Sequence, residues 1–132
     1  GTPAAGDRDA RNGLACARAM AASVEAWNTG RIAVGDPPIQ VSFGLHYGPV
    51  VLGDIGLNRL EFAVIGNTVN IASRLEALTR AHDATIVASD ALIARAQQEP
   101  SDDDGSLFEG FTKKTDQAIR SVEHPMTLWV RR

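Results

Sequence analysis

The pattern of apolar and polar residues predicts a long amphipathic helix at the start of the chain. Apolar side chains recur every three or four positions, the spacing of one helical face, at Ala10, Leu14, Ala17, Met20, Val24 and Trp27. Asp7 and Asp9 suit the first turn of this helix, and Arg11 falls on another face. The segment Asn28-Thr29-Gly30 predicts the end of the helix.

A period of two replaces the helical period after the Gly- and Pro-containing connector 31–38. Residues 39–45 alternate apolar and polar side chains, as expected for a strand with one buried face. After the turn Tyr47-Gly48-Pro49, residues 50–52 begin a second strand. We expect these two strands to pair with each other as a hairpin.

Residues 62–80, FAVIGNTVNIASRLEALTR, predict a buried strand, a break at Gly66 and an amphipathic helix. Asn70 and Arg74 lie four residues apart and therefore project from one side of this helix. They border the apolar stripe formed by Ile71, Leu75 and Leu78. An amide and a guanidinium at the margin of a buried surface are suited to holding a phosphorylated ligand.

The pattern shortens beyond this helix. Residues 84–87 predict a brief strand and residues 91–98 a short helix, with Ser89 or Asp90 as its N-cap. The loop 99–105, EPSDDDG, carries several carboxylates but lacks the spacing of a calcium-binding loop. We therefore expect it to be a solvated acidic loop.

Residues 106–111 and 126–131 are the last two predicted strands, joined by a polar segment. The basic residues of this segment are Lys113, Lys114 and Arg120, for which a solvated loop and a phosphate contact are both open interpretations. No internal repeat or second domain is evident. We expect residues 1–132 to form one α+β domain, a mostly antiparallel sheet with helices packed on one side.

Composition and charge argue against nucleic acid as a partner and favour a cytoplasmic location. The chain has 132 residues, enough for a core, and a formal net charge of -3, which gives no basic field for nucleic acid. The single cysteine, Cys16, cannot form an internal disulfide, which favours a reducing, cytoplasmic setting. No apolar run reaches membrane-spanning length, and the N-terminal residues lack the features of a signal peptide.

Three segments in this order resemble the catalytic domain of class III nucleotidyl cyclases: VSFGLHYGPVVLGDIG, LEFAVIGNTVNIASRLEALT and AIRSVEHPMTLWV. The resemblance implies part of a ferredoxin-like cyclase domain. It also implies cyclisation of a nucleoside triphosphate to the 3′,5′-cyclic monophosphate with release of pyrophosphate. We expect an adenylate cyclase acting on ATP, with a guanylate cyclase acting on GTP as the alternative.

The resemblance also implies roles for particular residues. Asn70 matches the family asparagine that fixes the ribose, and Arg74 matches the arginine that contacts the phosphates in the transition state. Arg120 lies near a basic position directed toward the terminal phosphates. Structural alternatives are that Arg74 pairs with Glu76 and that Asn70 satisfies a backbone group.

The purine-reading position of the family is occupied by Ala63. A methyl group neither donates nor accepts a hydrogen bond, so the usual discrimination between bases at this position is absent. The preference between ATP and GTP is therefore open from the sequence. His46 lies beside the predicted turn. It is either a partly exposed histidine of the strand or a titrating general base, and the first is the commoner case.

The family binds two Mg²⁺ or Mn²⁺ ions through two aspartates that precede the long helix. The match in this chain begins after those positions, so we expect no metal ligand here, Asp7, Asp9 and Asp54 included. The resemblance thus implies a C-terminal part of a catalytic domain, inactive alone, within a parent protein that forms head-to-tail homodimers. The rival hypotheses are a non-catalytic cyclase-homology module and an unrelated α+β interaction domain.

Overall fold

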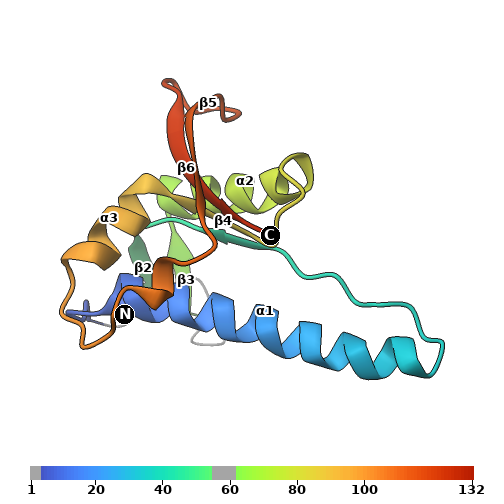
Figure 1. The fold of residues 1–132 in the computed structure, drawn as a ribbon. Coiled ribbons are helices and arrows are strands. Elements are labelled where there is room, and N and C mark those ends of the chain that lie inside the picture. Colours follow the sequence, from blue (N-terminus) through green and yellow to red (C-terminus); the bar gives the residue numbers. More distant parts are fainter. Residues whose placement is uncertain (1–3, 55–61) are drawn as a thin grey trace.

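A computed structural model describes residues 4–54 and 62–132, which form three helices and a mixed sheet (Figure 1). The elements are α1 (Asp9–Ala33), β1 (Phe43–Leu45), β2 (Val51–Asp54), β3 (Phe62–Ile65), α2 (Asn67–Ala81), β4 (Ile86–Ser89), α3 (Asp90–Gln98), the 3₁₀ turn η1 (Ser106–Phe108), β5 (Thr112–Gln117) and β6 (Met126–Arg131). Four strands form a sheet in the order β1-β4-β6-β5, and β2 and β3 form a separate ribbon. Among these described strands only β1 and β4 pair in parallel, so the α+β class with a mostly antiparallel sheet is confirmed.

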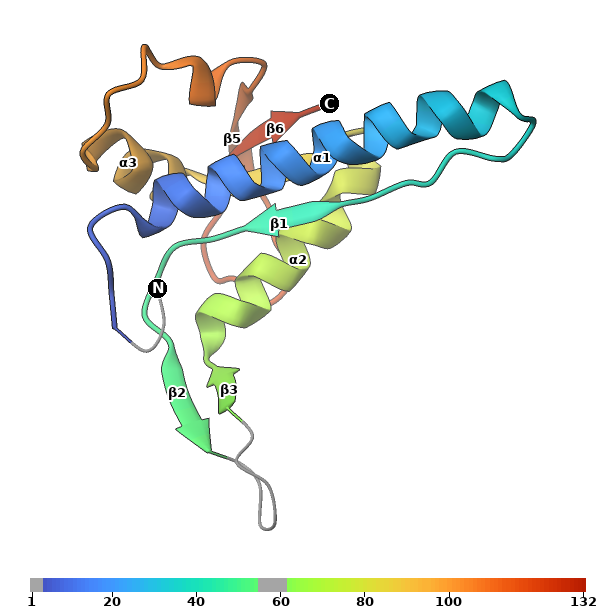
Figure 2. The same cartoon turned by 90° about the horizontal axis from the view of Figure 1, so that it is seen from below.

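All four residues of strand β4 are buried, because the strand lies between two hydrophobic clusters. Val87 packs with Leu75 of α2 on one face, whereas Ala88 packs with α1 and α3 on the other. Figures 1 and 2 show α1 and α2 on opposite sides of β1. The expectation that the helices pack on one side is therefore wrong. A short apolar run without alternation is typical of a strand covered on both faces.

Helix α2 approaches β1 closely because residue 44 has no side chain. A Cβ built on Gly44 would lie 2.2 Å from the carbonyl oxygen of Ala72 and 2.3 Å from the nitrogen of Glu76. Only glycine allows backbone to approach backbone at this distance. This contact fixes the height of α2 above the sheet.

The predicted hairpin between residues 39–45 and 50–52 is wrong. The first strand is limited to Phe43–Leu45 and pairs in parallel with β4, and β2 pairs in antiparallel with β3. Proximity in sequence favours a hairpin, but β4 is buried on both faces and needs a neighbouring strand at each edge. The β2–β3 ribbon and α2 provide the crossover that a parallel β1–β4 pair requires.

Helix α1 continues past its predicted end at Asn28-Thr29-Gly30 and stops at Ala33. The Asn28 side chain does not cap the helix, because its Nδ2 donates to the Ile39 carbonyl at 2.8 Å and its Oδ1 accepts from the Ile39 nitrogen at 2.7 Å. The first residue after the helix with a left-handed backbone is Gly35, with φ of 84°. Asn28 therefore ties the returning connector to the helix.

Near the C-terminus, the predicted strand at 106–111 is wrong. Gly105, with φ of 88°, leads into η1, and Leu107 and Phe108 pack on the cluster formed by α1 and α3. The strand begins only at Thr112, so Lys113 and Lys114 lie in β5 rather than in a loop. The strand at 126–131 is confirmed as β6.

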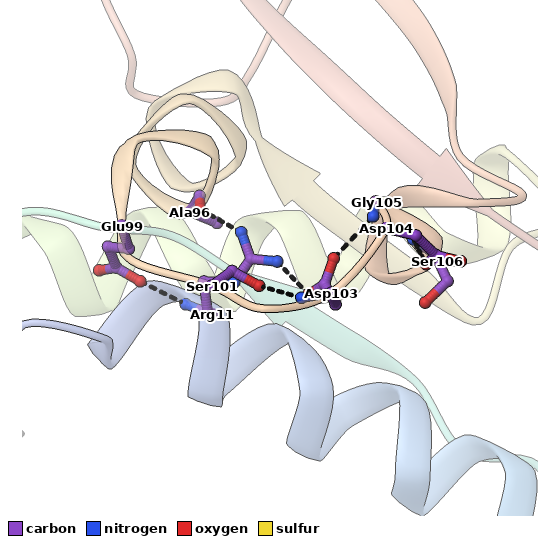
Figure 3. A network of polar contacts seen from close by, with 8 residues as sticks. All are labelled: Arg11, Ala96, Glu99, Ser101, Asp103, Asp104, Gly105 and Ser106. Carbon is purple, nitrogen blue, oxygen red and sulfur yellow. Dashed lines mark hydrogen bonds and ion pairs between the residues drawn. The ribbon is translucent and has the colours of Figure 1, made fainter.

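Figure 3 shows contacts that bear on two expectations, that Arg11 lies on another face of the helix than the apolar residues and that loop 99–105 is a solvated acidic loop. Arg11 is buried, with 6% exposure, and donates to the carbonyl of Ala96 at 2.8 Å and to the carboxylate of Asp103. Glu99 is equally buried and accepts from the backbone nitrogens of Ala10 at 3.0 Å and Arg11 at 2.8 Å. Within the acidic loop only Glu99 is buried, and residues 100–105 are exposed as expected for a solvated loop. Glu99 and Asp103 hold the N-terminus of α1 to the C-terminus of α3.

Candidate active site

The candidate site is built on the first turns of α2, where the chain passes from β3 into the helix. Gly66 makes this turn with φ of 147°, a conformation that strongly favours glycine, and it supplies no side-chain cap. Asn70 therefore lies in the first turn of α2, with its backbone nitrogen 3.4 Å from the Gly66 carbonyl. Figure 2 shows the β2–β3 ribbon extending beyond this end of the helix.

Asn70 is exposed and Arg74 is half-buried. In the part of the chain that the structure describes, neither side chain makes a hydrogen bond or an ion pair within the protein. Glu76, the structural alternative as partner for Arg74, instead lies 3.8 Å from Arg80. The guanidinium of Arg74 thus stands beside the core with its donors available to a ligand.

Arg120 lies in the loop between β5 and β6, next to a residue that packs with α2. Residues three and four apart on a helix are neighbours, so Arg74 adjoins Ile71 and Leu78. These two side chains pack on the cluster that contains Ile119, the residue before Arg120. Arg120 itself is exposed, without an ion pair among residues 4–54 and 62–132. The loop that carries Arg120 is thus tied to the hydrophobic cluster beneath α2 through Ile119, and a phosphate contact of Arg120 stays a prediction.

The two lysines of β5 are placed elsewhere. Lys113 lies 3.9 Å from Asp90 and 5.4 Å from the centre of the Trp129 ring, which are structural contacts. Lys114 lines a pocket of about 500 Å³ together with His82 and Arg132 at the C-terminal end of α2. The solvated or structural interpretation of these lysines is favoured, because Asn70 lies at the other end of the helix.

Ala63 pairs through its backbone with Gly53 in the β2–β3 ribbon. It lies in β3, which leads through Gly66 directly into the end of α2 that carries Asn70. The assigned position for reading the purine stays a prediction.

No group of three or more His, Cys, Asp or Glu side chains in residues 4–54 and 62–132 is arranged to hold an ion. Asp9 accepts from the Gly6 nitrogen at 2.7 Å, and Asp103 is paired with Arg11. The described residues therefore do not fit the two-ion site that the resemblance implies.

His46 packs at the end of β1, where its Nδ1 lies 2.8 Å from the hydroxyl of Ser89. Burial lowers the pKa of His46, which favours the neutral ring. The Ser89 hydroxyl also accepts from the nitrogen of Leu92 at 3.2 Å, which confirms Ser89 as the N-cap of α3. His46 thus serves as a structural link between β1 and α3.

Sequence reasoning did not single out Thr68, which belongs to the architecture of the site. Its hydroxyl donates to the carbonyl of Pro49 at 2.6 Å and joins the first turn of α2 to the turn after β1. A threonine in a helix is an ordinary residue, and the partner is 19 positions away in the sequence. The one available signal was the glycine before Pro49, which leaves room for this contact.

Comparisons with known proteins identify the family of the chain. A family model described as the adenylate and guanylate cyclase catalytic domain matches residues 4–118. Adenylate cyclase 1 of Rhizobium meliloti (strain 1021) is 36% identical over 96 residues, which is 72% of this chain and 14% of that protein. An adenylate cyclase of Anabaena cylindrica is 40% identical over 60 residues, 45% of this chain and 12% of that protein. The chain therefore spans a small part of the length of each curated relative.

A solved structure gives the same result for the fold. The crystal structure of the guanylyl cyclase Cya2 matches with a TM-score of 0.72 at 24% sequence identity, and the match covers 98% of this chain and 61% of that one. No helix in the described residues is both long and apolar enough to cross a membrane.

Proposed function

The chain belongs to the adenylate and guanylate cyclase catalytic domain family, and on this basis we propose that it is the C-terminal part of the catalytic domain of a longer adenylate cyclase. In the proposed reaction, the 3′ oxygen of ATP forms a bond to the α-phosphorus. The bond from that phosphorus to the β-phosphate oxygen breaks, pyrophosphate leaves, and the proton of the hydroxyl is released. The similarity to adenylate cyclases of Rhizobium meliloti and Anabaena cylindrica supports ATP as the substrate.

The chain contributes two side chains to this reaction in the proposal. The amide of Asn70 orients the ribose, so that the attacking oxygen is held in line with the α-phosphorus. The guanidinium of Arg74 donates to the phosphate oxygens as negative charge builds up on them. Arg120 assists at the terminal phosphates.

The single observation that carries the proposal is that Arg74 is half-buried but has no hydrogen-bond or ion-pair partner among the described residues. A half-buried arginine normally finds a carboxylate or carbonyl partner, because burying its charge unpaired is costly. Arg74 has none among the described residues, although Glu76 is two positions away and pairs with Arg80. A phosphate bound at the Asn70–Arg74 side of α2 would supply the missing acceptors.

The same end of the molecule is suited to a second subunit. Exposed apolar side chains gather on the β2–β3 ribbon and the first turn of α2, with exposures of 64% for Val51, 47% for Val64, 51% for Ile65 and 39% for Val69. Apolar surface of this kind marks protein–protein contact. We place the interface of a head-to-tail homodimer of the parent protein here, next to Asn70.

The proposed active site is therefore shared and is incomplete in this chain. The aspartates that bind Mg²⁺ or Mn²⁺ lie, in this proposal, outside residues 1–132, and the bound ions would stabilise the charge of the polyphosphate. The isolated chain then has no turnover. A cytoplasmic location, favoured by the single cysteine, fits access to ATP.

A non-catalytic, nucleotide-binding regulatory module is the second candidate, and Ala63 favours it. A methyl group at the purine-reading position cannot distinguish adenine from guanine by hydrogen bonding. The same observation keeps a guanylate cyclase open as an alternative, as does the fold shared with the guanylyl cyclase Cya2.

Turnover of ATP and GTP by the full-length parent protein and by the 132-residue chain tests the proposal. We expect cyclic AMP from the parent, little cyclic GMP, and neither product from the chain alone. Cyclic GMP as the main product would refute the choice of substrate. Absence of turnover with both nucleotides, together with retained nucleotide binding, would establish the regulatory module.

A further inference from the structure

The first turn of α2 is anchored by one hydroxyl from within the helix. Thr68 is the second residue of α2, and its Oγ1 donates to the Pro49 carbonyl at 2.6 Å. The N-cap residue, Gly66, offers no side-chain hydrogen bond to the free backbone N–H groups of this turn. Further along the helix, α2 is attached to the sheet by the close approach of Ala72 to Gly44 and by the packing of Leu75 with Val87.

The turn that receives this hydrogen bond is itself held in place. The Ser89 hydroxyl accepts from the Leu92 nitrogen, so its proton is available to donate to Nδ1 of His46. Ser89 is fully buried, which makes this link to His46 a rigid one. Further along, a Cβ on Gly48 would lie 2.7 Å from Oγ1 of Thr68, so the turn presses directly against that side chain.

We propose that Thr68 is a positioning residue for the nucleotide site, an inference that rests on the proposed cyclase function. Thr68 precedes Asn70 by two residues in the same helical turn. Its hydrogen bond to the fixed 46–49 turn sets the place of the Asn70 amide relative to the sheet. The contacts of Ala72 and Leu75 with the sheet lie further along the helix, so without the hydroxyl the first turn of α2 loses its link to the 46–49 turn and shifts or frays.

Amide hydrogen exchange in the 132-residue chain tests the anchor without any reference to activity. Thr68→Val keeps the shape of the side chain but removes the donor, and Thr68→Ser keeps the donor. We expect Thr68→Val to raise exchange at Val69 and Asn70 by about tenfold and Thr68→Ser to stay near wild type. Ser73→Ala, which removes an exposed hydroxyl from the same helix, is the matched control. Equal exchange in Thr68→Val and wild type would overturn the anchor.

Turnover by the parent protein tests the consequence for the site. We expect Thr68→Val to lower kcat about tenfold while KM changes less than threefold, with rescue by Thr68→Ser, because misplacing the ribose weakens the transition state more than binding. Thr68→Val with wild-type kcat, in a protein where Arg74→Ala is inactive, would refute the positioning role. Full activity of Arg74→Ala would instead refute the proposed function and leave the exchange result to stand by itself.

Discussion

Substitution of Glu99 by glutamine tests the attachment of α1 most sharply. The Glu99 carboxylate accepts from two consecutive backbone nitrogens in the first turn of α1, at 3.0 Å and 2.8 Å, and lies 3.4 Å from Nε of Arg95. With 6% exposure, it is largely shielded from water. In Glu99→Gln one of the two oxygens becomes an NH₂ group, which faces a backbone N–H and cannot accept from it.

The expected loss follows from these contacts. A buried N–H left without an acceptor costs about 1–3 kcal/mol. Loss of the negative charge at a helix N-terminus adds about 0.5–1 kcal/mol. Together, Glu99→Gln should lower the free energy of unfolding by about 1.5–4 kcal/mol, a large part of the stability of a domain of this size. Urea denaturation followed by circular dichroism measures this difference.

Glu123→Gln is the matched control, since Glu123 is exposed and makes no side-chain hydrogen bond or ion pair in the described structure. It should change the free energy of unfolding by less than about 0.5 kcal/mol. If Glu99→Gln were no more destabilising than Glu123→Gln, the carboxylate would not hold α1 as described, and the network of Figure 3 would have to be abandoned as a source of stability.

Three further predictions concern the fold. Gly44→Ala should destabilise the chain by about 1–3 kcal/mol in the same denaturation assay, because its Cβ would meet the backbone of α2; an unchanged midpoint would disprove the close packing. Gly30→Ala should stabilise by about 0.5–1 kcal/mol, because residue 30 lies inside α1 with open space around it, and a loss of stability would contradict the helical assignment. Arg11 lowers the pKa of Asp103 to about 2, so the stability from this pair should be complete above about pH 4 and lost as the pH falls toward 2. Acid titration should therefore show a smaller loss of stability between pH 4 and 2 in Asp103→Asn than in wild type, and parallel curves would refute the pairing.

Local patterns in the sequence predicted the segment around the candidate site well. The strand at 62–65, the break at Gly66 and the following helix all depend on neighbouring residues, and the structure has them at those positions. The expected burial of that strand is wrong, because Val64 is 47% and Ile65 51% exposed in the two-stranded β2–β3 ribbon. The N-cap at Ser89 was likewise one of two adjacent candidates and is confirmed by its bond to Leu92. Where neighbouring residues stabilise an element, periodicity and capping chemistry are sufficient to predict it.

Long-range pairing could not be predicted in the same way. Glu99 accepts from the backbone nitrogen of Ala10, which is 89 positions away in the sequence, and no pattern near Ala10 predicts that acceptor. Arg11 was assigned to another face of the helix because its partners, Ala96 and Asp103, come from the far end of the chain. The pairing of β1 with β4 has the same origin, because strand partners are chosen by the whole sheet rather than by the adjacent turn.

The candidate site was predicted in part. Its two helical residues followed from spacing and from the family resemblance, and the structure adds that Arg74 has no partner in the described residues. The contribution of Thr68 could not be foreseen, because it depends on where the Pro49 carbonyl lies in space. The roles of Asn70, Arg74, Ala63 and Arg120 stay predictions.

The most direct test of the central claim is the single-turnover rate of ATP cyclisation by the parent protein carrying Arg74→Ala, with the ATP dissociation constant measured in parallel. Arg80→Ala, on the same helix and paired with Glu76, is the control and should be nearly wild type. We expect the rate to fall about 100- to 1,000-fold for Arg74→Ala, with ATP affinity changed less than about threefold, because the guanidinium acts on charge that develops during the reaction. A wild-type cyclisation rate in Arg74→Ala would contradict the central claim.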